Sequence, residues 1–102
     1  MGFDNLIDGF DWDEGNREKC QKHGVSISEI ESIFTDGEVT IFCDEKHSHE
    51  EERLIAVGQT NGKRHILIVF TVRKYQKKHF IRPISARYMH KKEVKYYEKE
   101  TT

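Results

Sequence analysis

The seven residues from Ile66 to Val72 form the longest uninterrupted apolar run in the chain. A strand that is apolar on both faces belongs in the middle of a sheet, so we predict a central strand here. A second extended segment follows at residues 80–87, where Pro83 lacks an N–H donor and is therefore expected at an edge or a bulge. Guanidinium groups on a rigid sheet suit an anionic, phosphorylated ligand. Three arginines follow or interrupt the two segments: Arg73, Arg82 and Arg87.

Two helices are predicted before the sheet. Asp13 can cap a helix that continues to about Lys22 and ends at Gly24, which tolerates the left-handed conformation of a helix exit. Ser26 and Glu29 have the spacing of a capping box at the start of a second helix. Apolar residues then recur at helical spacing and predict core contacts for that helix. These residues are Ile27, Ile30, Ile33 and Phe34.

The remaining segments read as strands, turns and a final helix. An edge strand is expected at residues 10–12, and further strands at 39–42 and 54–60. Asn61-Gly62 predicts a type I′ hairpin turn before the central strand, because both residues accept positive φ. The polar residues 43–52 predict a surface loop, and residues 74–78 a polar turn. A C-terminal helix is expected from about Met89 to Glu98, beyond which no element is predicted.

These elements define an α+β domain. It has two N-terminal helices, an antiparallel sheet of about four strands and a C-terminal helix, with the helices on one face of the sheet. With 102 residues the chain is expected to be one domain over residues 1–102, with residues 1–9 frayed. No segment approaches the ~20 apolar residues of a membrane span. The first residues lack signal-peptide features, so a cytoplasmic location is expected, with Cys20 and Cys43 as reduced thiols.

The net charge of −1 conceals an asymmetry between the two halves of the chain. Residues 1–52 carry 4 Lys/Arg and 15 Asp/Glu, a net charge of −11, whereas residues 53–102 carry 13 and 3, a net charge of +10. A local positive field captures phosphate groups, so this composition does not exclude nucleic acid as a ligand. The alternative is that the two halves neutralise one another across the fold.

Metal and covalent catalysis have little support in the sequence. Cys43 with His47 and His49, and Cys20 with His23, lack the repeated Cys/His pairs of a zinc finger, so we expect no metal site. Nothing in the linear sequence places a base and an orienting group beside a serine or cysteine nucleophile.

A set of basic residues fits a different chemistry. RNA cleavage without a metal needs a base for the 2′-hydroxyl, cationic donors for the charge on phosphorus and an acid for the leaving 5′-oxygen. Side chains that can supply these roles are Lys22, His23, Arg53, Arg73, Arg82 and Arg87. Arg73 also continues the strand face of Leu67, Val69 and Thr71 beyond the apolar core. The alternative is that these arginines lie at the sheet periphery and pair with the acidic half.

Several short motifs, in this order and spacing, resemble the BrnT toxins of prokaryotic type II toxin–antitoxin modules. The resemblance extends from Phe10 to about Glu98. It rests on Phe10-Asp11-Trp12-Asp13, Lys22-His23-Gly24-Val25-Ser26, Phe34, His47-Ser48, Glu51-Glu52-Arg53, Gly58, Thr71 to Arg73, and Ile84-Ser85-Ala86-Arg87 with the Tyr-rich helix after it.

The resemblance implies a RelE-like fold and a ribonuclease without metal or other cofactor that inhibits translation. It also implies neutralisation by a BrnA-like ribbon-helix-helix antitoxin, with DNA contacted only through that antitoxin, and no membrane partner. The catalytic residues that it implies are Lys22, His23, Glu51, Arg53, Arg73 and Arg87. We expect RNA contacts at Trp12, Lys77, Lys78 and Arg82. His23 or Glu51 is the expected base, Arg73 and Arg87 surround the phosphate, and Trp12 is a stacking or core aromatic.

Two functions stay open at this point. One is a toxin ribonuclease. The other is a catalytically weak RNA- or protein-binding module that acts mainly through its antitoxin complex in DNA-bound autoregulation. Both would use the same basic face, so the sequence does not separate them.

Overall fold

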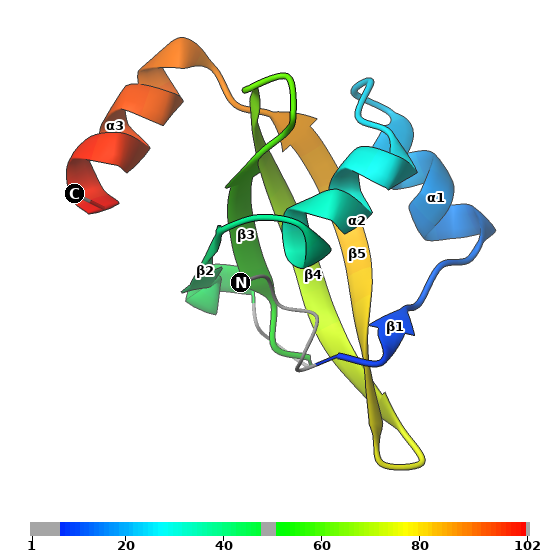
Figure 1. Cartoon of the computed structure of the whole chain (residues 1–102). Coiled ribbons are helices and arrows are strands. Elements are labelled where there is room, and N and C mark those ends of the chain that lie inside the picture. Colours follow the sequence, from blue (N-terminus) through cyan, green and yellow to red (C-terminus); the bar gives the residue numbers. More distant parts are fainter. Residues whose placement is uncertain (1–6, 48–50, 102) are drawn as a thin grey trace.

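The computed structural model describes residues 7–47 and 51–101, which form one five-stranded sheet with helices on both sides (Figure 1). The strand order is β1-β5-β4-β3-β2, with β1 parallel to β5 and every other neighbouring pair antiparallel. The elements in chain order are β1 (Gly9–Phe10), α1 (Glu14–Gln21), α2 (Ile27–Thr35), β2 (Val39–Cys43), the 3₁₀ helix η2 (Glu45–His47), β3 (Leu54–Gln59), β4 (His65–Tyr75), β5 (Lys78–Tyr88) and α3 (Lys91–Thr101). The predicted α+β class is confirmed.

β4 is the middle strand of the sheet, as the apolar run predicts. Ile66, Ile68 and Phe70 are fully buried and alternate along one face, where they meet α2 in the core. Both β4 and β5 extend further than the apolar residues indicate, and they form a long hairpin that projects beyond the rest of the sheet (Figure 1). The turn between them has only two residues, Gln76 and Lys77, with φ of 49° and 70°. This is the backbone of a type I′ turn.

The predicted type I′ turn at Asn61-Gly62 is wrong. Lys63 N–H donates to Thr60 O over 2.9 Å, and the positive φ of 64° belongs to Lys63 rather than to Asn61 or Gly62. Thr60 N–H donates to Arg64 O over 2.9 Å and closes a three-residue loop. Such loops place one left-handed residue at the end of the turn. The prediction that β3 and β4 form a hairpin is confirmed.

Pro83 lies at a β-bulge, one of the two places predicted for it. Val69 pairs with Ser85 but Phe70 pairs with Pro83, so Ile84 is the additional residue. The free carbonyl of Pro83 accepts a 2.9 Å hydrogen bond from Asn16 Nδ2. The bulge therefore anchors α1 to the sheet through the buried amide of Asn16.

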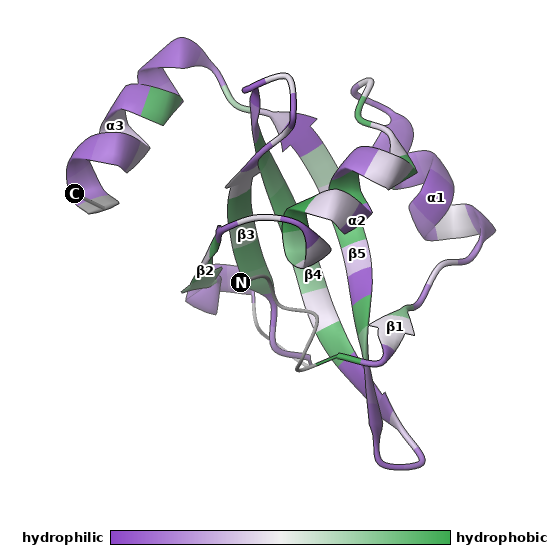
Figure 2. Cartoon of the chain, viewed as in Figure 1, coloured by the Kyte–Doolittle hydropathy of each residue, from purple (hydrophilic) through white to green (hydrophobic). Residues whose placement is uncertain are grey.

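The two N-terminal helices begin as predicted. Asp13 caps α1 and exchanges reciprocal hydrogen bonds with Asn16, and Ser26 does the same with Glu29 at α2. Phe34 of α2 is fully buried and packs edge-on against Phe70, with ring centroids 5.0 Å apart. Figure 2 shows the hydrophobic residues concentrated on the middle strands, whereas α1 and most of α3 are hydrophilic.

α3 lies on the opposite face of the sheet, so the prediction of helices on one face only is wrong. Its Tyr96 and Tyr97 line a groove with Val57 and Leu67. Val57 and Leu67 pair across β3 and β4 and alternate with the residues that meet α2. No pattern within α3 itself determines which face of the sheet it covers.

Other predictions concern the ends and the cysteines. The expected frayed segment 1–9 lies mostly outside the described residues, but Ile7 packs against the core and Asp8 N–H donates to His79 O over 2.7 Å. Cys20 and Cys43 are both free thiols, as predicted. Within residues 7–47 and 51–101, no helix has the length and apolar character needed to span a membrane.

Gly58 is expected to tolerate no larger side chain. A Cβ at this position would lie 2.7 Å from Ile33 Cγ2, where α2 crosses β3. Gly58→Ala should therefore lower the free energy of unfolding by about 1–3 kcal/mol through overpacking. Urea denaturation measures this change. Gly62→Ala is the matched control, because its Cβ would lie 3.7 Å from Thr60 Oγ1. Equal stability of the two variants would contradict the prediction.

Candidate functional site

The face of the sheet that α2 leaves uncovered carries the arginines singled out by sequence. We call it the open face. On β4, alternation places Leu67, Val69, Thr71 and Arg73 there, because the intervening residues are buried against α2. α3 covers one end of this face, near β2 and β3, and the β4–β5 hairpin forms the other end (Figure 1).

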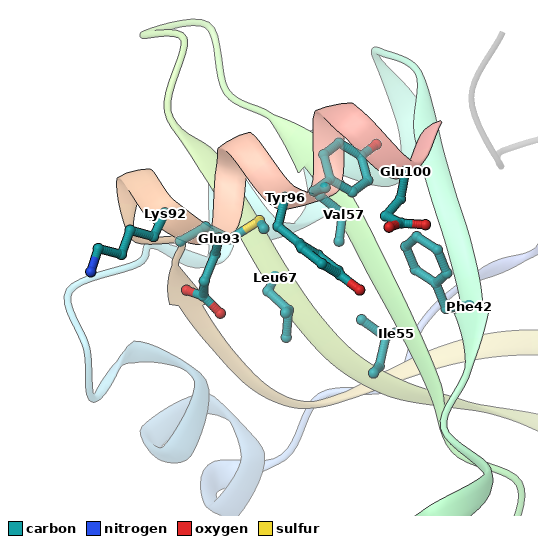
Figure 3. A pocket seen from close by; sticks show the side chains of 10 residues that line it. Phe42, Ile55, Val57, Leu67, Lys92, Glu93, Tyr96 and Glu100 are labelled. Atoms are coloured by element: carbon teal, nitrogen blue, oxygen red, sulfur yellow. The ribbon is translucent and has the colours of Figure 1, made fainter. Parts of the chain in front are cut away.

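A groove of about 620 Å³ separates α3 from the open face, and we call it the apolar groove. Figure 3 shows Tyr96 extending from α3 over the sheet, with Leu67 and Ile55 beneath it and Phe42 at the far wall. Phe42 is 40 % exposed and Tyr96 69 % exposed. Exposed aromatic side chains around one concavity are typical of a surface that binds another molecule.

Arg87 links α3 to the sheet. Its Nη1 and Nη2 donate to the two carboxylate oxygens of Glu93 over 2.7 and 2.8 Å. Glu93 Oε1 also accepts from His90 N–H, at the start of α3. The Arg87 hydrogen bond, helped by that of His90, lowers the pKa of Glu93 to about 2, and Glu93 in turn raises the pKa of Arg87. The paired guanidinium borders the apolar groove, because Arg87 faces Leu67 in the ladder.

The depressed pKa of Glu93 predicts a pH-dependent contribution to stability. The unfolded carboxyl titrates near 4.5 and the folded one at about 2, so the stabilising effect is complete above pH 4.5. It is lost as the pH falls through about 2. The stability difference between the natural chain and Glu93→Gln should therefore shrink in urea titrations from pH 5 downward. A difference that stays constant over this range would contradict the linkage.

A second cluster of charges lies toward the hairpin end of the open face. Arg73 Nε donates to Glu51 Oε2 over 3.2 Å, and Arg73 Nη1 lies 3.9 Å from Asp11 Oδ2. Arg82 Nη1 lies 3.6 Å from the same Asp11 oxygen, and its Nη2 donates to Asp13 over 2.7 Å. The Glu51 hydrogen bond raises the pKa of Arg73. The acidic half of the chain therefore pairs with the arginines here.

Thr71 determines where Glu51 and Arg53 lie. This buried hydroxyl donates to Glu52 O over 2.7 Å, so the segment before β3 is fixed beside β4. Arg53 O accepts from Asp44 N–H over 2.8 Å, which ties the other side of the segment to η2. The structure thus brings Glu51, Arg53 and Arg73 into one neighbourhood.

Arg73 and Arg87 do not share this neighbourhood. Arg87 pairs with Leu67, six residues before Arg73 on β4. At about 3.3 Å per strand residue, the two positions are separated by about 20 Å along the sheet. The backbone positions are this far apart, and Glu51 holds one guanidinium while Glu93 holds the other, so the two groups do not converge on one point.

Trp12 is held by the protein. Its indole N–H donates to Glu31 Oε2 over 2.9 Å, and the half-buried ring packs against the core. The Arg17 guanidinium lies 5.9 Å from its ring centroid. In this position Trp12 joins the segment after β1 to α2.

The remaining predicted site residues lie at opposite ends of the molecule. Lys22 and His23 are exposed in the turn between α1 and α2, at the end of the sheet away from the β4–β5 hairpin (Figure 1). Lys77 and Lys78 are exposed at the tip of that hairpin. The structure therefore does not bring His23 together with Arg73.

Cys20 and His47, both singled out by sequence, have surroundings or partners of their own among the described residues. Burial raises the pKa of the Cys20 thiol to about 11, which keeps it protonated. In the part of the chain that the structure describes, no three His, Cys, Asp or Glu side chains are grouped to hold a metal ion. His47 Nδ1 instead lies 3.1 Å from Asp44, and His49 is outside the described residues.

Sequence reasoning missed three residues that shape the site. Asp11 lies between two arginines, Thr71 positions the segment containing Glu51, and Glu93 holds Arg87. Thr71 could have been noticed in the sequence, because it is the one hydroxyl residue within the apolar run. No sequence pattern points to Glu93, because its partner Arg87 lies across the turn between β5 and α3.

Comparison with protein families gives a match over most of the chain. The family model described as the ribonuclease toxin, BrnT, of type II toxin-antitoxin systems matches residues 12–93. This range includes Arg73 and Arg82 with their carboxylate partners Glu51 and Asp13, the strands of the open face and the start of α3. Comparison with curated proteins gave no match. The chain therefore belongs to the BrnT family of ribonuclease toxins of type II toxin–antitoxin systems.

Proposed function

We propose that this protein cleaves RNA on the open face of its sheet, without a metal ion, and thereby inhibits translation in the cytoplasm. The observation that carries the proposal is the contact between Arg73 and Glu51, which places a guanidinium beside a carboxylate on an exposed, rigid surface. A cation for the phosphate and a base for the 2′-hydroxyl are then adjacent.

In the proposed reaction Glu51 acts as the base and Arg73 binds the scissile phosphate. The Glu51 carboxylate accepts the proton of the 2′-hydroxyl, and the 2′-oxygen forms a bond to phosphorus. The bond between phosphorus and the 5′-oxygen breaks, and that oxygen takes a proton from water. The products are a 2′,3′-cyclic phosphate and a 5′-hydroxyl. Arg73 stabilises the charge that develops on the phosphoryl oxygens.

Glu51 is preferred to His23 as the base because of position. Glu51 contacts Arg73 directly, whereas His23 lies in the α1–α2 turn at the other end of the sheet. Arg87 is assigned to a phosphate further along the same strand of RNA, since it lies about 20 Å along the sheet from Arg73. Arg53, Lys77, Lys78 and Arg82 surround the Arg73 end and supply further positive charge for the RNA backbone.

Incubation of the purified protein with RNA in EDTA tests the proposal. Cleavage should persist and leave cyclic or 3′-phosphate ends, which a ligation or mass assay identifies. Loss of cleavage in EDTA with recovery in magnesium would refute the proposed chemistry. Glu51→Gln, which keeps size and hydrogen-bonding capacity but removes the base, is the matched variant.

One observation favours the alternative of a catalytically weak binding module. In the free chain each of the three arginines on the sheet already pairs with a carboxylate: Arg73 with Glu51, Arg82 with Asp13 and Arg87 with Glu93. RNA must compete with these partners. Expression of the chain alone separates the two functions, because a ribonuclease arrests growth and an inert binding module does not.

The antitoxin implied by the family is proposed to cover the open face. We assign the apolar groove as the place where it inserts side chains, because Phe42 and Tyr96 are exposed there beside Lys92. The acidic segment from Asp44 to Glu52 is expected to stay peripheral to the contact, since its charge repels an acidic inhibitor. Glu51 is the exception, because its charge is paired with that of Arg73 on the open face. A BrnA-like ribbon-helix-helix partner would then carry the DNA contact.

A further inference from the structure

A second groove lies on the other side of α3, and no role in the proposed reaction uses it. Its volume is about 540 Å³. It is formed by the β3–β4 loop, the start of β4, the connection between β5 and α3, and one face of α3. We call it the basic groove, and its lining residues are Lys63, Arg64, His65, Met89, Lys91, Val94, Lys95 and Glu98.

The basic groove concentrates positive charge over an apolar floor. Four of its side chains are cationic and one, Glu98, is anionic. On α3, Lys91, Val94 and Lys95 recur at helical spacing and so share one face. The residues of α3 that line the apolar groove, among them Glu93 and Tyr96, lie on a different face. α3 therefore separates an aromatic groove from a cationic one.

The cations of the basic groove project from ordered backbone. Lys63 ends the β3–β4 loop in a left-handed conformation, and its carbonyl accepts from Gln59 Nε2 over 3.0 Å. The Arg64 guanidinium lies 3.5 Å from the ring centroid of Tyr88. Met89 N–H donates to His65 O over 2.9 Å and fixes the start of the connection to α3. The groove is thus a shaped surface, not a set of independent lysines.

We propose that the basic groove binds the backbone of single-stranded RNA beyond Arg87. This rests on the proposed ribonuclease function and extends its substrate contact to a second site. The groove begins at Met89, two residues past Arg87, so one strand of RNA can pass from the open face onto it. Lysines at its rim pair with phosphates, and the apolar floor and the Arg64 guanidinium, whose other side rests on the Tyr88 ring, accept bases.

RNA fits this groove better than an acidic protein segment does. A guanidinium stacked on an aromatic ring presents a flat cationic face, on which a nucleobase can stack. Met89 and Val94 line the groove together with the lysines, and their apolar surface accommodates bases rather than carboxylates. An acidic protein segment is therefore the competing ligand of this groove, and the experiment must exclude it.

The test compares two charge-reversed proteins. One carries Lys63→Glu, Lys91→Glu and Lys95→Glu in the basic groove. The control carries Lys19→Glu, Lys46→Glu and Lys99→Glu, which are exposed lysines outside it with the same change in net charge. Fluorescence anisotropy measures the affinity of each for a 2′-O-methyl RNA oligonucleotide, which cannot be cleaved, over a range of salt concentrations. Circular dichroism confirms that both proteins are folded.

The groove variant should lose on the order of 10-fold or more in affinity. Each phosphate contact of a single strand contributes about 0.7 to the slope of log affinity against log salt, so the loss of three contacts should reduce that slope by about 2. The control should bind like the natural chain. Cleavage of saturating short RNA should be unchanged by the groove substitutions. Equal losses in both variants would overturn the inference while leaving the ribonuclease proposal intact.

Two other outcomes separate the remaining possibilities. If the natural chain neither binds nor cleaves RNA, the proposed function fails and the groove assignment fails with it. Poly-glutamate and unlabelled RNA are compared as competitors at equal total negative charge. If poly-glutamate displaces the labelled RNA as well as unlabelled RNA does, the groove binds anions in general and the inference is wrong.

Discussion

Arg73→Ala should lower the turnover of RNA cleavage on the order of 10²-fold or more, the usual effect of removing one donor that stabilises transition-state charge. Arg87→Ala should instead raise KM and leave turnover nearly unchanged. The reason is the separation of the two arginines by about 20 Å, which assigns them to different phosphates. Steady-state kinetics with an oligonucleotide that spans both positions measures the two parameters separately.

Arg73→Lys and a measurement of stability are the controls for this prediction. Lysine keeps the charge but not the planar pair of donors, so it should recover part of the turnover. The ion pair of Arg73 with Glu51 is exposed, so its loss should change the free energy of unfolding by less than about 1 kcal/mol. If turnover falls with Arg87→Ala and not with Arg73→Ala, the reaction occurs at the α3 end. If neither variant changes, both arginines are structural.

Replacement of both Phe42 and Tyr96 by Ala should weaken antitoxin binding on the order of 30-fold or more, about 2 kcal/mol, mainly through faster dissociation. These aromatic side chains extend over the apolar groove, where a partner would exclude water from them (Figure 3). Stopped-flow and surface-based kinetics with the cognate antitoxin measure both rates.

Tyr75→Ala is the matched control for the aromatic substitutions. Tyr75 is 55 % exposed but lies near the tip of the β4–β5 hairpin, away from the groove. Because Tyr75 does not line the apolar groove, its replacement should speed dissociation much less than the double substitution does. Association should slow as salt rises, because the arginines of the open face attract the partner, and Arg82→Glu should slow it further. A salt-independent association rate would show that the partner binds elsewhere.

The sequence by itself determined the elements of this protein whose signals are local. The uninterrupted apolar run identifies the central strand, and the caps Asp13 and Ser26 set the starts of α1 and α2. Pro83 indicated the bulge because a missing N–H is a property of the residue itself. The turn at Asn61-Gly62 shows the limit of such local signals. Both residues accept the positive φ of a type I′ turn, but in the folded chain the left-handed conformation is adopted by Lys63 instead.

Only the tertiary structure decided which charges meet. Arg73 forms ion pairs with Asp11 and Glu51 across the sheet, and Arg87 forms one with Glu93 across a turn. No spacing in the sequence encodes these pairs. The same holds for α3, which crosses to the face opposite α2 because Tyr96 and Tyr97 find apolar partners there. Sequence reasoning grouped His23 with Arg73 by chemical type. Backbone geometry separates them, because the α1–α2 turn and the β4–β5 hairpin lie at opposite ends of one sheet.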